Sequence, residues 1–345
     1  MKGSSRRSAP EPPGPGEPPE PPEPPEQESV ARTILGEEPE FDAADVAERT
    51  GLSIDDARRL WRALGFPEHG DDRAFNRSDV AAVSTLVTGV QSGLLDFDLV
   101  VKLTRAVGQT MARLADWEVA AVLSRIEDLQ GSSEGPVSRM DTARQLLAEF
   151  GVPFEELLVY SWRRHLAAAV ARIEALGADE EDLSTSQLSV GFADIVSFTA
   201  LSNDISREQI GDLVEVFESR CSDVVARNNG RIIKSIGDSV LFVNDDAIRA
   251  YDTAEGIIAV IGRDKRMPDV RVGLASGSVV MRMGDVFGPP VNMAARLTAV
   301  ARRNRIIIDA ATARLLPEDQ FETRRLPARP MRGFGLLEPV AVRRN

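Results

Sequence analysis

Two aspartates stand at the ends of strand-like segments, where their carboxylates suit the binding of a divalent cation. Asp194 is the seventh residue of the apolar run LSVGFADI (188–195), and the SFT that follows is typical of a helix start. Asp238 lies in the turn of a hairpin predicted over 230–243. Carboxylates at the ends of adjacent strands can converge on one or two hard cations, as phosphoryl transfer requires. Taken singly, Asp194 also fits a helix N-cap, and Asp238 fits an ordinary turn residue.

A polar pair, Asn292 and Arg296, occupies the segment PVNMAARL (290–297). The two residues are four positions apart, so they share one face if the segment is helical. Gly288 and the two prolines after it place the pair in the first turns behind a glycine-containing loop. Directed at a phosphate, this face would stabilise the charge that develops in a transition state. A solvated helix face with a surface arginine is the alternative.

The composition excludes several other chemistries. The 345 residues include 41 Lys and Arg against 54 Asp and Glu, a formal net charge of −13. The only histidines are His69 and His165, and Cys221 is the only cysteine, so a disulfide within the chain is excluded and a Cys/His zinc site is disfavoured. A bound metal would therefore be held mainly by oxygen. The acidic balance also disfavours nucleic acid as a partner.

The elements that must position these residues fall into distinct regions. Residues 1–28 form a Pro/Glu-rich segment that predicts a disordered, polyproline-like tail, either without a specific partner or with a proline-rich docking motif. Residues 29–180 have helical periodicity, and 181–187 form an acidic hinge. From 188 to 345 the order is β-α-β-β-α-β, which predicts an α+β, ferredoxin-like domain.

The periodicity also places the individual elements. In the helical region we expect helices over 53–64, 99–129 and 141–150, and a further long helix from Pro153 to about Gly177. In the α+β region we expect strands over 188–195, 230–243, 269–280 and 305–310, and helices over 206–228, 246–262 and 290–303. The uncharged stretch 80–95 is too short and too polar for a membrane span, so we expect a cytoplasmic protein without one.

Three blocks of sequence, VGFADIVSFTALS, NGRIIKSIGDSVLFV and VRVGLASGSVVMRMGDVFGPPVNMAARL, together resemble the catalytic domain of the class III nucleotidyl cyclases. The resemblance covers roughly 186–345 and keeps the family's order of blocks. It implies a reaction in which a nucleoside triphosphate becomes its 3′,5′-cyclic monophosphate and pyrophosphate. It also implies two Mg²⁺ or Mn²⁺ ions as cofactors, which explains a site without a histidine base.

The resemblance assigns roles at the metal and phosphate end of the site. Asp194 and Asp238 match the two metal-binding aspartates, and the backbone carbonyl of Ile195 is expected to join them. The backbone amides of Phe198 and Thr199 are expected to bind phosphate.

The remaining matched residues are expected to bind the nucleoside and to stabilise the transition state. Lys234 and Asp285 match the positions that read the purine; a lysine can donate to adenine N1 and a carboxylate can accept from the N6 amine. The resemblance therefore implies an adenylyl cyclase with ATP as substrate. Asn292 should orient the ribose, Arg296 should stabilise the transferring α-phosphate, and Arg332 matches a residue that binds the terminal phosphates.

In this family one subunit supplies the metal aspartates and the other supplies the Lys, Asp, Asn and Arg set. All of these residue types are present in the single chain. The resemblance thus implies a homodimer with two equivalent composite sites, each completed by the partner.

The region before the cyclase blocks resembles the helical regulatory domain of actinobacterial soluble adenylyl cyclases, whose activity responds to pH through autoinhibition. The segment AERTGLSIDDARRLWRALGFP (47–67) and a long helix ahead of the catalytic blocks carry this resemblance. His165 in that helix is either a group that titrates between pH 5 and 8 or an ordinary surface histidine. A helix that extends or breaks there would assemble or dismantle the composite site.

Residues 41–83 also resemble the winged helix-turn-helix of MerR-type regulators, which gives an alternative function: a DNA-binding regulator with a cyclase-derived nucleotide-sensing domain. The segment carries nine acidic residues and six arginines, a net charge of −3, and its recognition helix would begin with Asp55 and Asp56. These charges would face phosphates of like sign. We therefore interpret the segment as a helix-turn-helix used for packing or dimerisation. A catalytically silent nucleotide-binding scaffold is the third hypothesis.

Overall fold

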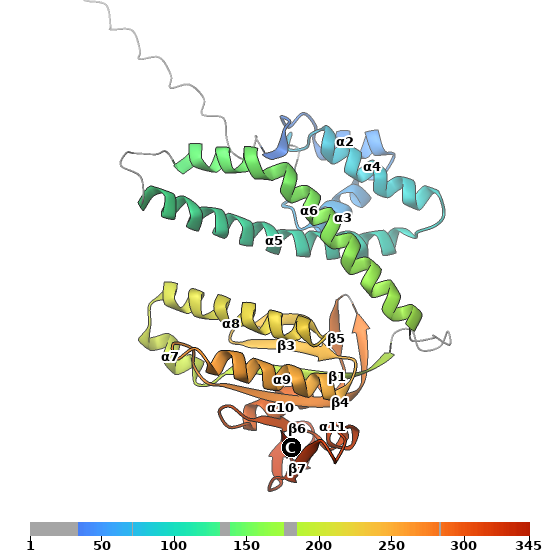
Figure 1. The fold of residues 1–345 in the computed structure, drawn as a ribbon. Helices are drawn as coiled ribbons and strands as arrows, with labels where there is room; N and C mark the ends of the chain where they lie inside the picture. Colours follow the sequence, from blue (N-terminus) through green and yellow to red (C-terminus); the bar gives the residue numbers. More distant parts are fainter. Residues whose placement is uncertain (1–33, 71, 132–138, 176–184, 283) are drawn as a thin grey trace, which may run out of the picture. The chain divides into compact units, whose positions relative to one another are not determined.

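The computed structural model describes residues 34–345 apart from four gaps, at 71, 132–138, 176–184 and 283 (Figure 1). By their internal contacts the residues divide into two units, Met1–Arg164 and His165–Asn345, here called the helical unit and the sheet unit. The predicted tail, residues 1–28, lies outside the described residues, and so does most of the predicted hinge.

The helical unit is built from consecutive helices whose starts are set by polar caps. Asp42 and Asn76 form capping boxes with the third residue of the helices they precede, and the Ser53 hydroxyl accepts from the Asp56 amide. Leu60, which is 1% exposed, lies in a small core between these helices. The helices are α2 (Ala43–Thr50), α3 (Ile54–Leu64), α4 (Arg77–Gln91), α5 (Phe97–Gly131) and α6 (Arg139–Ala175), and the part of α6 from His165 onward belongs to the sheet unit.

The helix break predicted before Pro153 is wrong. A single helix, α6, runs from Arg139 to Ala175 with Pro153 inside it. Proline removes one backbone donor and crowds the preceding turn, so a helix that continues through it bends. The ribbon of α6 changes direction along its length accordingly (Figure 1).

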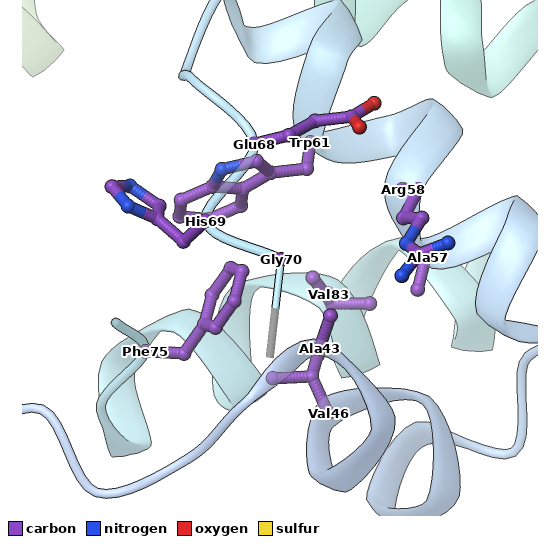
Figure 2. A pocket seen from close by; sticks show the side chains of 10 residues that line it. All are labelled: Ala43, Val46, Ala57, Arg58, Trp61, Glu68, His69, Gly70, Phe75 and Val83. Atoms are coloured by element: carbon purple, nitrogen blue, oxygen red, sulfur yellow. The ribbon is translucent and has the colours of Figure 1, made fainter. Parts of the chain in front are cut away.

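An aromatic cluster closes the helix-turn-helix-like segment. The Trp61 ring packs edge-on against Phe75, with the ring centroids 4.4 Å apart, and its indole nitrogen donates to the Pro67 carbonyl at 2.9 Å. Figure 2 shows these rings, with His69 and Val83, around a cavity of about 20 Å³. That volume accommodates a water molecule and excludes an organic ligand. Phe75 and Val83, which line this cavity, are each 5% exposed and belong to the core of the helical unit.

The sheet unit contains an eight-stranded sheet whose first half has the ferredoxin-like order. Four antiparallel strands neighbour one another in the order β2-β3-β1-β4, which is the arrangement of the β-α-β-β-α-β plan. The predicted α+β, ferredoxin-like fold is confirmed. The strands of the path are β1 (Thr185–Ile195), β2 (Arg231–Ile236), β3 (Ser239–Asn244), β4 (Val270–Arg282), β6 (Ile306–Ile308), β7 (Phe321–Arg325) and β10 (Val340–Arg344).

Further strands extend this frame. Strand β5 (Asp285–Phe287) pairs with the far end of β4, so the two form a hairpin. Strands β8 (Arg329–Met331) and β9 (Gly335–Leu337) form a separate two-stranded sheet. None of the helices in the described part of the chain combines the length and apolar character needed to span a bilayer.

Helices cover both faces of the sheet. On one face α8 (Arg207–Arg227) and α9 (Ala247–Gly262) lie beside each other along the strands (Figure 1). Their core includes Phe217, Phe242 and Ile257, each 0% exposed. The thiol of Cys221 lies in the same core, and burial raises its pKa to about 12. Short helices α7 (Phe198–Asp204) and α11 (Ala310–Leu315) complete this unit with α10 (Pro289–Val300).

Helix α10 packs on the opposite face, and a glycine sets its distance from the sheet. A Cβ atom on Gly273 of β4 would lie 2.4 Å from the Thr298 amide nitrogen and 2.5 Å from the Ala294 carbonyl oxygen. The Thr298 hydroxyl also contacts the Phe192 carbonyl of β1 at 3.2 Å. Because only glycine permits this approach, the second half of α10 is held tightly against β1 and β4.

Candidate active site

The two aspartates predicted to bind metal meet at one end of the sheet. Asp194 near the end of β1 pairs with Ser239 in the β1–β3 register, and Asp238 precedes Ser239 in the β2–β3 turn. The Ile195 amide donates to the Asp238 carbonyl at 3.1 Å. Burial raises the pKa of the Asp238 carboxyl, and the negative charge of Asp194 raises it further. A cation between the two carboxylates would relieve this repulsion, so the residues present fit a hard divalent ion.

An arginine that the sequence analysis did not single out occupies this cluster. Arg271 of β4 lies opposite Asp194 in the strand register, and its Nε and Nη2 atoms are 2.7 Å and 2.6 Å from Asp194 Oδ2. The Ser239 hydroxyl donates to the other oxygen, Oδ1, at 2.5 Å. Both oxygens of the Asp194 carboxylate are therefore engaged by donors from this chain. Only the pairing of β1 with β4, which is a tertiary feature, reveals the Arg271 contact.

The two residues predicted to read the purine also meet. Lys234 Nζ of β2 lies 2.5 Å from Asp285 Oδ2 of β5, and both side chains are partly exposed. Burial acts to raise the pKa of the Asp285 carboxyl, but hydrogen bonds from Lys234 and from the Val286 amide outweigh it and hold the pKa below its usual range. This carboxylate is thus ionised and paired.

The predicted pair on α10 is exposed. Asn292 and Arg296 lie one turn apart on the helix, and both are open to solvent. Gly288 immediately before the helix has φ 143°, a left-handed backbone that favours glycine, and Pro289 takes the first helical position. The loop before α10 therefore turns sharply and presents the first turns of the helix.

The other predicted phosphate-binding residues lie on two separate elements. Phe198 and Thr199 form the first turn of α7; Phe198 packs partly against the core, and Thr199 is exposed. Ser197 before them has φ 60°, which is unusual for a residue with a side chain and marks a sharp turn after β1. Arg332 is exposed in the turn between β8 and β9.

The site residues form two clusters within one chain. Asp194, Asp238 and Arg271 make the first, here called the metal cluster after its predicted role. Lys234 and Asp285 make the second, here called the Lys–Asp cluster. Within the described part of the chain, the hydrogen bonds and ion pairs that build these clusters do not link one to the other.

Two of the three arginines on α3, in the helix-turn-helix-like segment, are paired with carboxylates. Arg59 is paired with Asp98 at 2.5 Å, and Arg62 is paired with Glu68 at 2.9 Å. The first turn of α3 carries two aspartates. Because phosphate contacts dominate DNA affinity, these charges disfavour the DNA-binding alternative.

A ferredoxin-like sheet with two aspartates at one end and a Lys–Asp pair between two hairpins defines a nucleotidyl cyclase class of catalytic domain. Comparison with known families agrees: "Adenylate and Guanylate cyclase catalytic domain" matches residues 181–340, and "Adenylate cyclase regulatory domain" matches residues 26–166.

Relatives match most of the chain. An adenylate cyclase of Streptomyces coelicolor is 36% identical over 343 residues, covering 90% of this chain and 88% of the relative. An adenylate cyclase of Streptomyces griseus is 39% identical over 283 residues, covering 82% and 70%. A pH-sensitive adenylate cyclase of Mycobacterium tuberculosis is 28% identical, covering 91% and 81%. The chain belongs to the adenylate cyclase family and combines a cyclase catalytic domain with an adenylate cyclase regulatory domain.

Proposed function

We propose that this protein converts ATP to 3′,5′-cyclic AMP and pyrophosphate at composite sites between two copies of the chain, with two Mg²⁺ or Mn²⁺ ions. The observation that carries the proposal is the meeting of Asp194 and Asp238 at one end of the sheet, where burial, and then the negative charge of Asp194, raise the pKa of the Asp238 carboxyl. Such a pair is stabilised by a divalent cation.

The metal ligands would be the carboxylates of Asp194 and Asp238 with the backbone carbonyl of Ile195. The ions, when bound, supply a lowered pKa for the ribose 3′-hydroxyl and neutralise charge on the triphosphate. Ser239 keeps the Asp194 carboxylate oriented through its 2.5 Å hydrogen bond. The amides of Phe198 and Thr199 would bind phosphate at the turn that follows β1.

The adenine ring would be read by Lys234 and Asp285. In the free protein these two side chains satisfy each other. Lys234 would donate to adenine N1 and Asp285 would accept from the N6 amine, so the base replaces the ion pair by two directed hydrogen bonds. A guanine ring carries a donor at N1 and an acceptor at O6. The N1 donor would face the Lys234 ammonium, which is also a donor, and O6 would face the Asp285 carboxylate, which is also an acceptor.

Helix α10 and the β8–β9 turn would complete the site. Asn292 would orient the ribose, Arg296 would stabilise charge on the α-phosphate, and Arg332 would contact the terminal phosphates. Since the metal cluster and the Lys–Asp cluster are built separately within one chain, a dimer in which each copy completes the other brings them together twice.

A complementation experiment tests this arrangement. Asp194→Ala and Arg296→Ala variants should each be inactive with Mn²⁺ and ATP. A purified heterodimer of the two, isolated through different tags, should regain about half of the unmodified activity, because one of its two sites is intact. Cyclic AMP formation is the readout. An inactive heterodimer would show that the site is not composite, and an unmodified protein that forms no cyclic AMP would refute the activity.

The helical unit would regulate this activity in response to pH. The long helix α6 begins in the helical unit and carries the exposed His165, which is the first residue of the sheet unit. Removal of residues 1–180 should change the pH profile of cyclic AMP formation. A His165→Gln variant of the full chain is the matched comparison. An unchanged profile in the shortened protein would assign the helical unit a structural role only.

A further inference from the structure

One guanidinium group in the sheet unit holds two elements at once. Arg271 Nε and Nη2 contact Asp194 Oδ2 at 2.7 Å and 2.6 Å, and Arg271 Nη1 donates to the Ala299 carbonyl at 3.3 Å. Asp194 is the residue before the last of β1, and Ala299 lies in the last turn of α10. The Arg271 side chain is 29% exposed, and that of Asp194 is 13% exposed. Arg271 is therefore a partly buried bridge from the metal cluster to the end of a helix.

The contact with Ala299 is of a kind that stabilises a helix terminus. The last four carbonyls of an α-helix have no partner within the helix, and a cation near them also favours the negative end of the helix dipole. Arg271 supplies α10 with a donor for the Ala299 carbonyl and with a positive charge near the last turn. The Asp194 carboxylate fixes the guanidinium in this position through two donors, an arrangement that a planar guanidinium can make and an ammonium cannot.

The same helix carries the residues expected to act on the nucleotide. Arg296 lies three residues, or about one turn, before Ala299, and Asn292 lies one turn further toward the helix start. Gly273 lies in close contact with the backbone of Thr298, so α10 and β4 are tightly packed at this point. A change at the last turn is consequently transmitted along the helix rather than absorbed by loose packing.

We propose that Arg271 is a positioning residue that couples the two composite sites of the dimer. This inference rests on the proposed function, in which the Asp194 of one copy serves one site while the α10 of the same copy serves the other. Arg271 joins these two parts within each copy. Arg271 would be repelled by a cation held at Asp194 and would lose part of its hold on Ala299, so occupation of one site would alter Arg296 in the second site.

The test is a heterodimer with a single live site. One protomer carries Asp238→Ala, and its partner carries Arg296→Ala. The live site then uses the aspartates of the partner and the Arg296 of the first protomer. Arg271→Lys is added to the first protomer only, where Asp194 is retained, so the changed residue lies at the dead metal cluster. The matched control is Arg303→Lys in the same protomer, since Arg303 is 75% exposed and pairs loosely with Asp269 at 3.6 Å.

The heterodimer with Arg271→Lys should have a kcat lower by about fivefold or more, as expected for a coupling of 1–3 kcal/mol, with an unchanged Mn²⁺ dependence. The control should match the parent heterodimer. An active parent whose kcat is unaffected by Arg271→Lys would overturn the coupling and leave the proposed function intact. An inactive parent would overturn the composite site itself.

A second measurement uses the unmodified full chain and needs no catalysis. Hydrogen exchange of the amides at 297–301 is followed with and without Mn²⁺ alone. We expect faster exchange with Mn²⁺, because the helix end loses its cap, and no such change in the Arg271→Lys protein. Exchange that Mn²⁺ leaves unchanged in the unmodified chain would overturn the inference.

Discussion

Two aspartates of the same sheet unit have opposite electrostatic environments. Asp238 lies in a turn next to another carboxylate, and burial together with Asp194 raises the pKa of its carboxyl. Asp285 lies on a hairpin next to Lys234, and although burial opposes the effect, hydrogen bonds lower the pKa of its carboxyl. The first cluster has an excess of negative charge that a cation from solution would balance. The second is balanced within the chain, so a ligand must open it.

This contrast indicates different uses of the same residue type. A crowded carboxylate pair stores repulsion that metal binding releases, which favours the ion. A carboxylate that is already paired must give up that contact when a ligand binds, so it adds little net affinity. Its main contribution is to discriminate between ligands.

The largest effect is expected at the metal cluster. Asp194→Ala removes one of the two proposed metal carboxylates and should lower kcat by about 10³-fold, since metal ions supply several kcal/mol of transition-state stabilisation. Cyclic AMP formation at saturating Mn²⁺ and ATP measures it. Asp204→Ala, a change at an exposed residue of α7, serves as control. Retention of more than a tenth of the activity would place the metal elsewhere.

Disruption of the Lys–Asp cluster should weaken ATP binding and reduce the preference for ATP over GTP. Lys234→Ala leaves Asp285 without its partner and the adenine N1 without a donor. We expect KM for ATP to rise about 10- to 100-fold with a smaller change in kcat, in line with the 1–3 kcal/mol cost of an unsatisfied polar group. Steady-state kinetics with ATP and GTP measure both effects. A fall in kcat without a rise in KM would contradict a role in reading the base.

Metal binding should stabilise the folded protein only through the metal cluster, Asp194 and Asp238. At a Mn²⁺ concentration near 100 times its Kd, the free energy of unfolding should rise by about 2.7 kcal/mol. Thermal unfolding of the full chain with Mn²⁺ and then with EDTA measures the shift. Asp238→Asn should abolish most of it, whereas Asp285→Asn should leave it in place. An equal loss in both variants would remove the distinction between the clusters.

The smallest effects are expected on thermal stability without metal, where Asp238→Asn and Asp285→Asn should change Tm in opposite directions. The raised pKa of Asp238 means that its ionisation costs stability, so in EDTA at pH 7–8 Asp238→Asn should raise Tm by about 2–4 °C for each kcal/mol gained. The lowered pKa of Asp285 means that its ionised form is stabilising, so Asp285→Asn should lower Tm at the same pH.

Both differences should shrink as the pH falls. The cost of ionising Asp238 disappears as the pH falls through its raised pKa toward the ordinary aspartate value, where the carboxyl is protonated. The stability contributed by Asp285 is lost as the pH falls through its lowered pKa. Thermal unfolding from pH 8 to pH 3 measures both trends. Shifts of the same sign at neutral pH would contradict the comparison.

Local patterns predicted most of the fold. The hairpin turning at Gly237 and Asp238 and the helix expected over 246–262 are found as β2–β3 and α9 because alternation, periodicity and turn chemistry are local properties. The break at Pro153 was predicted from the same local rules and is wrong, since a long helix can bend and continue.

Tertiary contacts were only partly accessible from the sequence. The meeting of Lys234 with Asp285 follows the family resemblance, and the two residues are 51 positions apart. The Arg271–Asp194 contact depends on the β1–β4 register, and an arginine in a strand carries no local signal for its partner. The roles of all these side chains remain predictions that the experiments above test.

The state of Cys221 has a practical consequence. It is the only cysteine in the chain, it is 0% exposed, and burial raises the pKa of its thiol to about 12. At neutral pH we therefore expect the buried thiol to hold its proton and to react with maleimides or spin labels far more slowly than an exposed cysteine. A cysteine introduced at any exposed position of either unit would be the only one labelled. Pairs of such labels would yield distances between the regulatory and catalytic parts in the native protein, without first removing its own thiol.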